Sequence, residues 1–179
     1  MTRGDIVLMD TNVIIEAHRT KCWGAVVNAF KVETVEKCCE EAATGDKRRA
    51  DYVVINVEAM KKSVLIHPVT LLELAELETR LAEPDRIDPG EKHLLAHAMK
   101  KAAVWHVSAS DRAAVKAGSE LGLLDKFVSL EALARVVGMS PQLKQHFTEK
   151  WLGVEIQEVT LGAVAPLIIG PTGSGTAKP

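Results

Sequence analysis

The sequence predicts an α/β fold, a three-layer α/β/α sandwich around a central parallel sheet of four to five short strands. Two observations support this prediction. The run Ile6-Val7-Leu8-Met9 is apolar throughout, which is typical of a strand buried on both faces of a parallel sheet. Short runs of this kind alternate with helical patterns along the chain, and that alternation indicates a parallel sheet covered by helices on both faces.

The expected elements follow from the spacing of apolar residues. The strands, each a short apolar run, are expected at 6–9, 32–34, 64–66, 102–107 and 127–128. The helices, each with apolar residues at helical spacing, are expected at 11–19, 23–30, 35–44, 53–60, 71–82, 88–101, 111–121 and 130–137. Turn-forming residues separate them: Gly45 ends a helix, Pro68 closes a strand, Pro84 breaks the chain and Asp88-Pro89 begins a helix.

The chain is expected to divide into three parts. Residues 1–138 carry the alternation and form the predicted domain. Residues 139–169 are expected to hold a helix over 143–152 and an extended arm over 154–161. Residues 170–179 consist largely of Gly, Pro, Ser and Thr, which predicts a flexible tail.

Composition and charge narrow the classes of protein. A net charge of −2 argues against a protein that coats nucleic acid with a broad basic surface. No apolar run approaches the roughly 18 residues of a membrane span, so no membrane is expected. The N-terminus enters a strand at once, which is unlike a signal peptide. Together with three cysteines in no disulfide-like spacing, this predicts a cytoplasmic protein with reduced thiols.

Three acidic residues stand where chemistry is expected in such a fold. Asp10 follows the first strand, and Asp111 follows the strand expected to end at Val107. Ligands of open α/β sheets gather at the carboxyl ends of the strands, so these two carboxylates can meet. Glu91 shares a helix face with the apolar residues of its helix, which turns it toward the sheet. Clustered carboxylates suit Mg²⁺, which prefers oxygen ligands.

Each acid also has a purely structural interpretation. Asp10 and Asp111 are both good residues to cap the helices that follow them. Asp88, Pro89 and Glu91 fit the start of a helix, with Asp88 as the cap and Glu91 as its capping-box partner. Each interpretation is plausible alone, whereas three acids at three matching places favour a shared site.

The order of these motifs resembles the PIN-domain family over residues 5–137. Asp10-Thr11-Asn12, inside the apolar run from Val7 to Ile15, resembles the opening signature of that family. The segment 91–98 is similar to the third acidic position of the family, and the segment 104–111 to the fourth. Residues 121–130 resemble the closing strand and helix. The set of motifs in this order is more specific than any one of them.

The resemblance implies a metal-dependent ribonuclease that hydrolyses RNA phosphodiester bonds with Mg²⁺ or Mn²⁺. Asp10, Glu91 and Asp111 would hold the metal. The second acid of the family falls on Glu40 or Glu41, and we favour Glu40 as the catalytic residue and Glu41 as a neighbour. Thr11 and Asn12 would orient Asp10. The hydroxyl that the family places two residues before its last acid is replaced by Ala109, so Ser108 or Ser110 would supply it.

The same resemblance raises expectations about partners: an RNA substrate, a protein that neutralises a toxin-type enzyme, and a second copy of the chain. An alternative is a PIN-like scaffold or RNA-binding module whose site has degraded, and the altered segment at Ala109 leaves room for it. Nothing in the residues separates RNA from DNA. His93 and His97 are four residues apart, but Leu94 stands where a zinc-protease helix needs Glu, so we do not expect a zinc helix.

Overall fold

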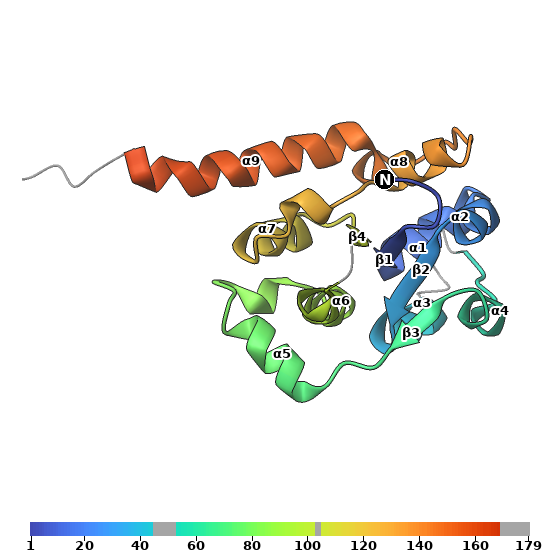
Figure 1. Cartoon of the computed structure of the whole chain (residues 1–179), viewed down its shortest axis with the longest axis horizontal. Helices are drawn as coiled ribbons and strands as arrows, with labels where there is room; N and C mark the ends of the chain where they lie inside the picture. The colour runs from blue at the N-terminus through green and yellow to red at the C-terminus, as the bar shows by residue number, and fades with distance from the viewer. Residues whose placement is uncertain (45–52, 103–104, 169–179) are drawn as a thin grey trace, which may run out of the picture.

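One parallel sheet lies at the centre of this computed structural model, which describes residues 1–44, 53–102 and 105–168 (Figure 1). The sheet has four strands, in the order β3-β2-β1-β4. They are β1 (Ile6–Met9), β2 (Lys31–Val35), β3 (Leu65–His67) and β4 (Trp105–Ser108). All pairings are parallel, so the carboxyl ends of the strands lie at one edge of the sheet. The predicted fold class, an α/β/α sandwich with a parallel sheet, is confirmed.

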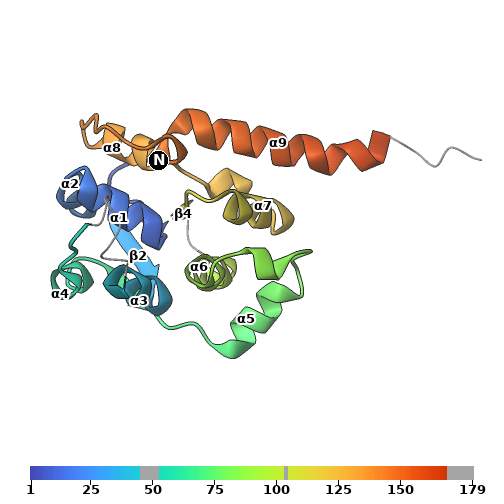
Figure 2. The same cartoon turned by 180° about the vertical axis from the view of Figure 1, so that it is seen from behind.

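Helices connect the strands and cover both faces of the sheet (Figures 1 and 2). They are α1 (Thr11–Arg19), α2 (Trp23–Ala29), α3 (Glu36–Thr44), α4 (Val57–Lys61), α5 (Leu71–Glu78), α6 (Pro89–Lys100), α7 (Arg112–Glu120), α8 (Leu130–Val136) and α9 (Glu149–Ile168). Three short 3₁₀ turns are η1 (Pro84–Arg86), η2 (Leu124–Lys126) and η3 (Gln145–Phe147).

The alternation of side chains along β1 explains why its four residues are all apolar. Leu8 joins a buried cluster with residues of α5, α6 and α7 on one face of the sheet. Val7 and Met9 join a second cluster with residues of α1, α2 and α8 on the other face. Successive side chains of a strand point to opposite faces, so a strand between two helical layers must be apolar at every position.

Three elements near the C-terminus differ from the prediction. The expected strand at 127–128 is only an isolated bridge between Phe127 and Val107, because η2 ends just before it and Ser129 already caps α8. The expected extended arm over 154–161 is wrong, since these residues are part of α9. The expected helix over 143–152 is also only partly right, because η3 and a separate helix start at Glu149 replace it.

Helix α9 is explained by its packing. Leu152 is buried in the cluster on the α6 side of the sheet, and Ile156 and Val159 are partly buried against the same cluster. These positions recur at helical spacing, so contact with the domain outweighs the strand preference of β-branched residues. Figure 1 shows α9 running along α7 and then extending past it.

Other boundaries move by a few residues. Asn56 caps α4, so the helix expected from 53 begins at Val57. Strand β3 is shifted by one residue from 64–66. The predicted tail at 170–179 lies outside the described residues. Within the described ranges, we find no helix that is both long and apolar enough to span a membrane. The three cysteines, Cys22, Cys38 and Cys39, are buried and unbridged.

Candidate metal centre

Asp10 lies at the carboxyl end of β1, next to the end of β4. Its backbone N–H donates to the carbonyl of Ser108 at 3.0 Å, which continues the pairing of the two strands. The side chain is almost fully buried and caps α1, because Oδ2 accepts a hydrogen bond from the Asn12 backbone N–H at 3.0 Å. Oδ1 faces the thiol of Cys38 at 3.9 Å. The structural interpretation of Asp10 as a cap is therefore correct, but it uses only one of the two oxygens.

Glu91 is buried, and its carboxylate oxygens form no hydrogen bonds with the described residues. It lies in the first turn of α6 and is only 2% exposed. Both carboxylate oxygens are buried and have no hydrogen-bond partner in the part of the chain that the structure describes. Asp88 occupies the cap position of α6 but its side chain makes no capping bond among these residues. The capping box expected from the sequence is therefore not formed, and capping does not explain Glu91.

The protonation of these two acids reflects their burial and their neighbours. Burial, together with the nearby charges of Glu41 and Asp88, raises the pKa of Asp10 to about 6, although hydrogen bonds from the backbone of Asn12 and Thr11 oppose this shift. Burial likewise raises the pKa of Glu91 to about 9, with additional repulsion from Asp10, Asp111, Asp88 and Glu41. Carboxylates that repel one another in a buried place are stabilised by a cation. Five acids therefore act on one another at the edge of the sheet.

Asp111 forms the exposed side of this group. It caps α7, and its Oδ1 accepts from the Ala113 backbone N–H at 2.7 Å. Asp111 also lines a cleft of about 830 Å³ between α7, α9 and the segment before α6. Arg86, Arg112 and Lys116 line the same cleft. The exposed acid thus lies between the buried acids and a cleft that these three cations line together with Glu83, Glu120 and Glu158.

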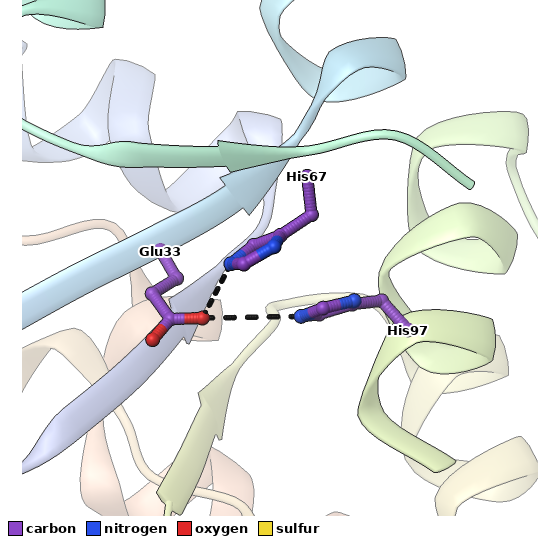
Figure 3. A group of neighbouring side chains, drawn as sticks. All are labelled: Glu33, His67 and His97. Carbon is purple, nitrogen blue, oxygen red and sulfur yellow. Dashed lines mark hydrogen bonds and ion pairs between the residues drawn. The ribbon is translucent and has the colours of Figure 1, made fainter. Parts of the chain in front are cut away.

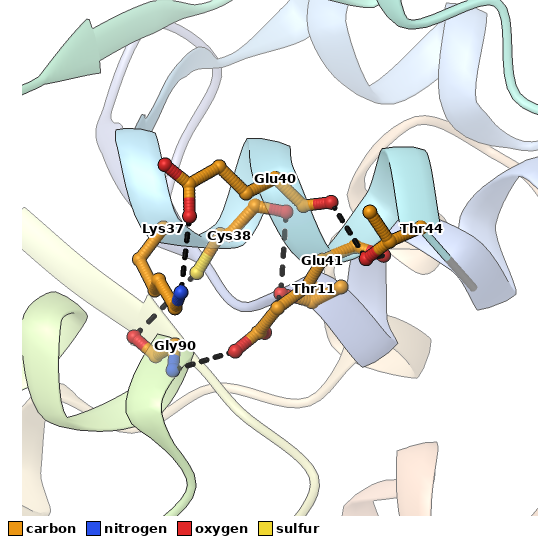
Figure 4. A network of polar contacts seen from close by, with 7 residues as sticks. All are labelled: Thr11, Lys37, Cys38, Glu40, Glu41, Thr44 and Gly90. Atoms are coloured by element: carbon orange, nitrogen blue, oxygen red, sulfur yellow. Dashed lines mark hydrogen bonds and ion pairs between the residues drawn. The ribbon is translucent and has the colours of Figure 1, made fainter.

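Glu41, not Glu40, is turned toward Thr11 and Gly90 (Figure 4), and its charge acts on Asp10. Glu41 Oε2 accepts from the Thr11 hydroxyl at 2.7 Å, and Oε1 accepts from the Gly90 backbone N–H at 2.9 Å. Glu40 points away from the group, is exposed, and pairs with Lys37 at 3.0 Å. The preference for Glu40 is therefore corrected. The two residues stand at similar angles from the apolar stripe of α3, and only the positions of Thr11 and Gly90 decide between them.

Gly90 makes the approach of Glu41 possible. A Cβ atom at residue 90 would stand 2.3 Å from Glu41 Oε2 and 2.9 Å from Glu41 Cδ, closer than nonbonded atoms can lie. Any other residue at this position would push the carboxylate away from α6. Gly90 therefore leaves room for the Glu41 carboxylate, which is the flexible end of a side chain and could move aside if a Cβ were added.

The residues expected to orient Asp10 have different partners. The Thr11 hydroxyl bonds to Glu41 instead of Asp10. Asn12 holds Asp10 through its backbone N–H, and its side chain is exposed. Ser108 and Ser110 are both buried, and the Ser108 hydroxyl makes no hydrogen bond within the described residues.

Asp88 is the acid that the sequence did not single out. It raises the pKa of both Asp10 and Glu91, so its carboxylate lies within electrostatic range of the two buried acids. It precedes Glu91 by three residues, a spacing that places two side chains on one side of a helix. The spacing of Asp88 and Glu91 could have indicated that Asp88 also belongs to the acidic group, but the sequence pattern identifies Asp88 only as a helix cap.

Comparisons with known proteins do not assign a function to this chain. No protein-family model matches the chain, and a search of curated proteins finds no match either. The arrangement offers carboxylate oxygens, which hard divalent cations prefer, and the buried oxygens of Glu91, which lack partners among the residues that the structure describes. Its chemistry fits the binding of Mg²⁺ or Mn²⁺.

Proposed function

We propose that this chain is a metal-dependent ribonuclease of the PIN-domain kind, with a Mg²⁺ or Mn²⁺ site formed by Asp10, Glu91 and Asp111. The observation that supports it most is the buried carboxylate of Glu91, whose two oxygens have no partner among the described residues. An unpaired buried carboxylate is unfavourable for folding unless something else binds it. A divalent cation among the five acids satisfies this requirement.

The roles of the residues follow from their contacts. Asp10 presents Oδ1 while Oδ2 caps α1, and Asp111 presents its second oxygen in the same way. Glu41 is held rigidly by Thr11 and Gly90, so it fixes one wall of the site. A bound Mg²⁺ or Mn²⁺ would supply the activation of a water molecule and the stabilisation of the leaving oxygen. Glu91 must lose its proton before it can bind a cation.

The cleft beside Asp111 supports a phosphate-bearing substrate. Arg112 pairs with Glu155 at 3.1 Å and also with Glu158, and Lys116 pairs with Glu83. The pairs with Glu158 and Glu83 are exposed and weak in water, so a phosphate can compete for these cations. Arginine and lysine beside a metal site are the groups that hold a nucleic-acid backbone. We prefer RNA because of the family resemblance.

The function is tested by cleavage of a labelled single-stranded RNA with Mn²⁺, and of a DNA of the same sequence. Asn caps a helix nearly as well as Asp, so Asp10→Asn keeps the cap and removes the charge. We expect Asp10→Asn to abolish RNA cleavage while the variant stays folded. Undiminished cleavage by this variant would disprove the site, and equal cleavage of DNA would disprove the RNA preference.

The neighbouring glutamates provide a matched pair of variants on one helix. Glu41→Gln should lower the cleavage rate by roughly 10- to 100-fold, because it removes a charge that faces Asp10. Glu40→Gln should leave the rate close to that of the parent, since Glu40 faces solvent. A parent protein that binds Mn²⁺ or RNA but cleaves neither nucleic acid would instead favour a PIN-like scaffold or RNA-binding module.

A further inference from the structure

A second group of metal-binding side chains lies away from the acids, between β2, β3 and α6 (Figure 3). It consists of Glu33, His67 and His97, one from each of these elements. Glu33 Oε2 lies 2.6 Å from His67 Nε2 and 3.8 Å from His97 Nε2. The ligand atoms of the three residues all lie within 4.8 Å of one another. Residues distant in sequence are thus brought to one point by the order of the sheet and the path of α6.

This group is separate from the metal centre proposed above. Glu33 lies within β2, two residues before its end, whereas Asp10 follows the end of β1. His97 is six residues after Glu91 on α6, about 9 Å along the helix axis. The two groups also differ in chemistry, because one offers carboxylates and the other offers two imidazoles and one carboxylate.

We propose that Glu33, His67 and His97 form a second metal site, which binds Zn²⁺ or a similar first-row divalent ion. Two histidines and one carboxylate are a ligand set that suits zinc, whereas imidazole nitrogen is a poor ligand for Mg²⁺. The three side chains are only 8%, 23% and 15% exposed, so little water surrounds them.

The distances require only a local adjustment. Ligand atoms around a tetrahedral zinc ion stand about 3.4 Å apart, given bond lengths of roughly 2.0–2.2 Å. The separations of 2.6 and 3.8 Å from Glu33 Oε2 bracket this value. His67 and His97 are stacked, with ring centroids 4.0 Å apart and planes inclined by 22°. Metal binding would move the rings out of this stack so that both nitrogens point at the ion.

Lys101 places a positive charge beside Glu33, where a metal ion would bind. Its Nζ donates to Glu33 Oε2 at 2.7 Å, so without a metal the carboxylate is neutralised by this ammonium group. Lys101 is the residue at the C-terminal cap of α6, and its long side chain can turn toward solvent. The ammonium group and the metal compete for the same oxygen atom. Removal of the lysine charge should therefore favour the metal.

A metal at this place would join three elements of the fold. β3 is the edge strand of the sheet and has only three residues, so its own pairing is limited. A bound ion would connect it to β2 and to α6. The expected role is structural, and it is independent of the proposed ribonuclease reaction.

The test is a calorimetric titration of the full chain with Zn²⁺, in an Asp10→Asn background that weakens the acidic centre. We expect one saturable site in this background. His97→Gln should weaken its binding by on the order of 100-fold, and Lys101→Met should tighten it about tenfold, the value of one charge-assisted hydrogen bond. The matched control is His106→Gln, since His106 is partly buried and lies 3.5 Å from a carboxylate oxygen of Asp5, outside the cluster.

The outcomes separate the explanations. Zn²⁺ binding that depends on His97 and not on His106 supports the proposal, whether or not the parent cleaves RNA. Absence of saturable Zn²⁺ binding in the Asp10→Asn background would overturn it. Equal losses from His97→Gln and His106→Gln would do the same, because they would indicate general unfolding or nonspecific binding. Weaker binding after Lys101→Met would overturn the competition between lysine and metal.

Discussion

Replacement of Glu91 by Gln should stabilise the protein in the absence of metal. Glu91 is 2% exposed and both of its oxygens lack hydrogen-bond partners among the described residues. Gln has nearly the same shape but cannot ionise. The substitution therefore removes the cost of protonating this carboxylate on folding, and it leaves the packing of α6 almost unchanged.

The magnitude follows from the proton that folding must take up. At pH 7 the unfolded chain carries an ionised Glu91, because its ordinary pKa is 4.5, while burial and repulsion raise the folded pKa to about 9. The carboxyl group therefore binds a proton on folding. The free-energy cost is set by the difference between pH 7 and pKa 4.5, which corresponds to about 3 kcal/mol. Gln avoids this cost, so we expect a gain of about 1–3 kcal/mol, reduced by the buried amide of Gln.

The sign of the pH dependence provides the control. A raised acid pKa means that the parent loses stability as the pH rises from 4.5 toward 9, whereas Glu91→Gln does not lose this contribution. Urea unfolding with a chelator at pH 4.5 and pH 7 measures both. The gain should be present at pH 7 and nearly absent at pH 4.5. Equal destabilisation at both pH values would refute the electrostatic argument, because it would indicate a loss of packing alone.

Three further predictions test the acidic centre and the core. The affinity for Mn²⁺ should rise between pH 6 and pH 9, because the raised pKa values of Asp10 and Glu91 mean that protons must leave; calorimetry showing a flat profile would contradict this. Gly90→Ala should weaken Mn²⁺ binding roughly tenfold with little change in thermal stability, since its Cβ displaces the Glu41 carboxylate. Unchanged Mn²⁺ titrations would argue against Glu41 as part of the centre. Gly118→Ala should destabilise the fold by about 1–3 kcal/mol in urea, because its Cβ would lie 2.3 Å from the buried Phe127 ring. A stabilised Gly118→Ala variant would show that helix propensity outweighs this contact.

Periodic patterns in the sequence predicted the fold well. The apolar run of β1 and the alternation of strands and helices are local properties, and they determine the layers around a parallel sheet. The prediction of an extended arm over 154–161 is wrong because the strand preference of β-branched residues is weaker than the packing of this segment against the domain. Its buried side chains face α7, and that contact is not visible in the local sequence.

The site was predictable where a residue follows a strand and unpredictable where it depends on a partner. Asp10 and Asp111 stand after β1 and β4, so strand order alone brings them near each other. Glu41 could not be distinguished from Glu40, since the choice depends on Thr11 and Gly90 from other elements.

The group of Glu33, His67 and His97 could not be predicted from the sequence for a related reason. Its members come from three elements that are far apart along the chain. Only the pairing of β2 with β3 and the position of α6 bring them together. The spacing of His93 and His97 on α6 does not indicate His67, which lies on β3.

Asp10 and Asp111 each cap a helix and also belong to the proposed metal site, so they would be retained in evolution for two separate reasons. Each residue closes a helix with one oxygen, so selection for stability alone would retain both even if the reaction were no longer needed. Glu91 differs, because its oxygens have no hydrogen-bond partner among the described residues and its burial opposes folding. Under the proposed function, a lineage that lost catalysis would replace Glu91 early and keep the aspartates. Among relatives of this chain, the residue at position 91 is therefore a better marker of an active lineage than the aspartates.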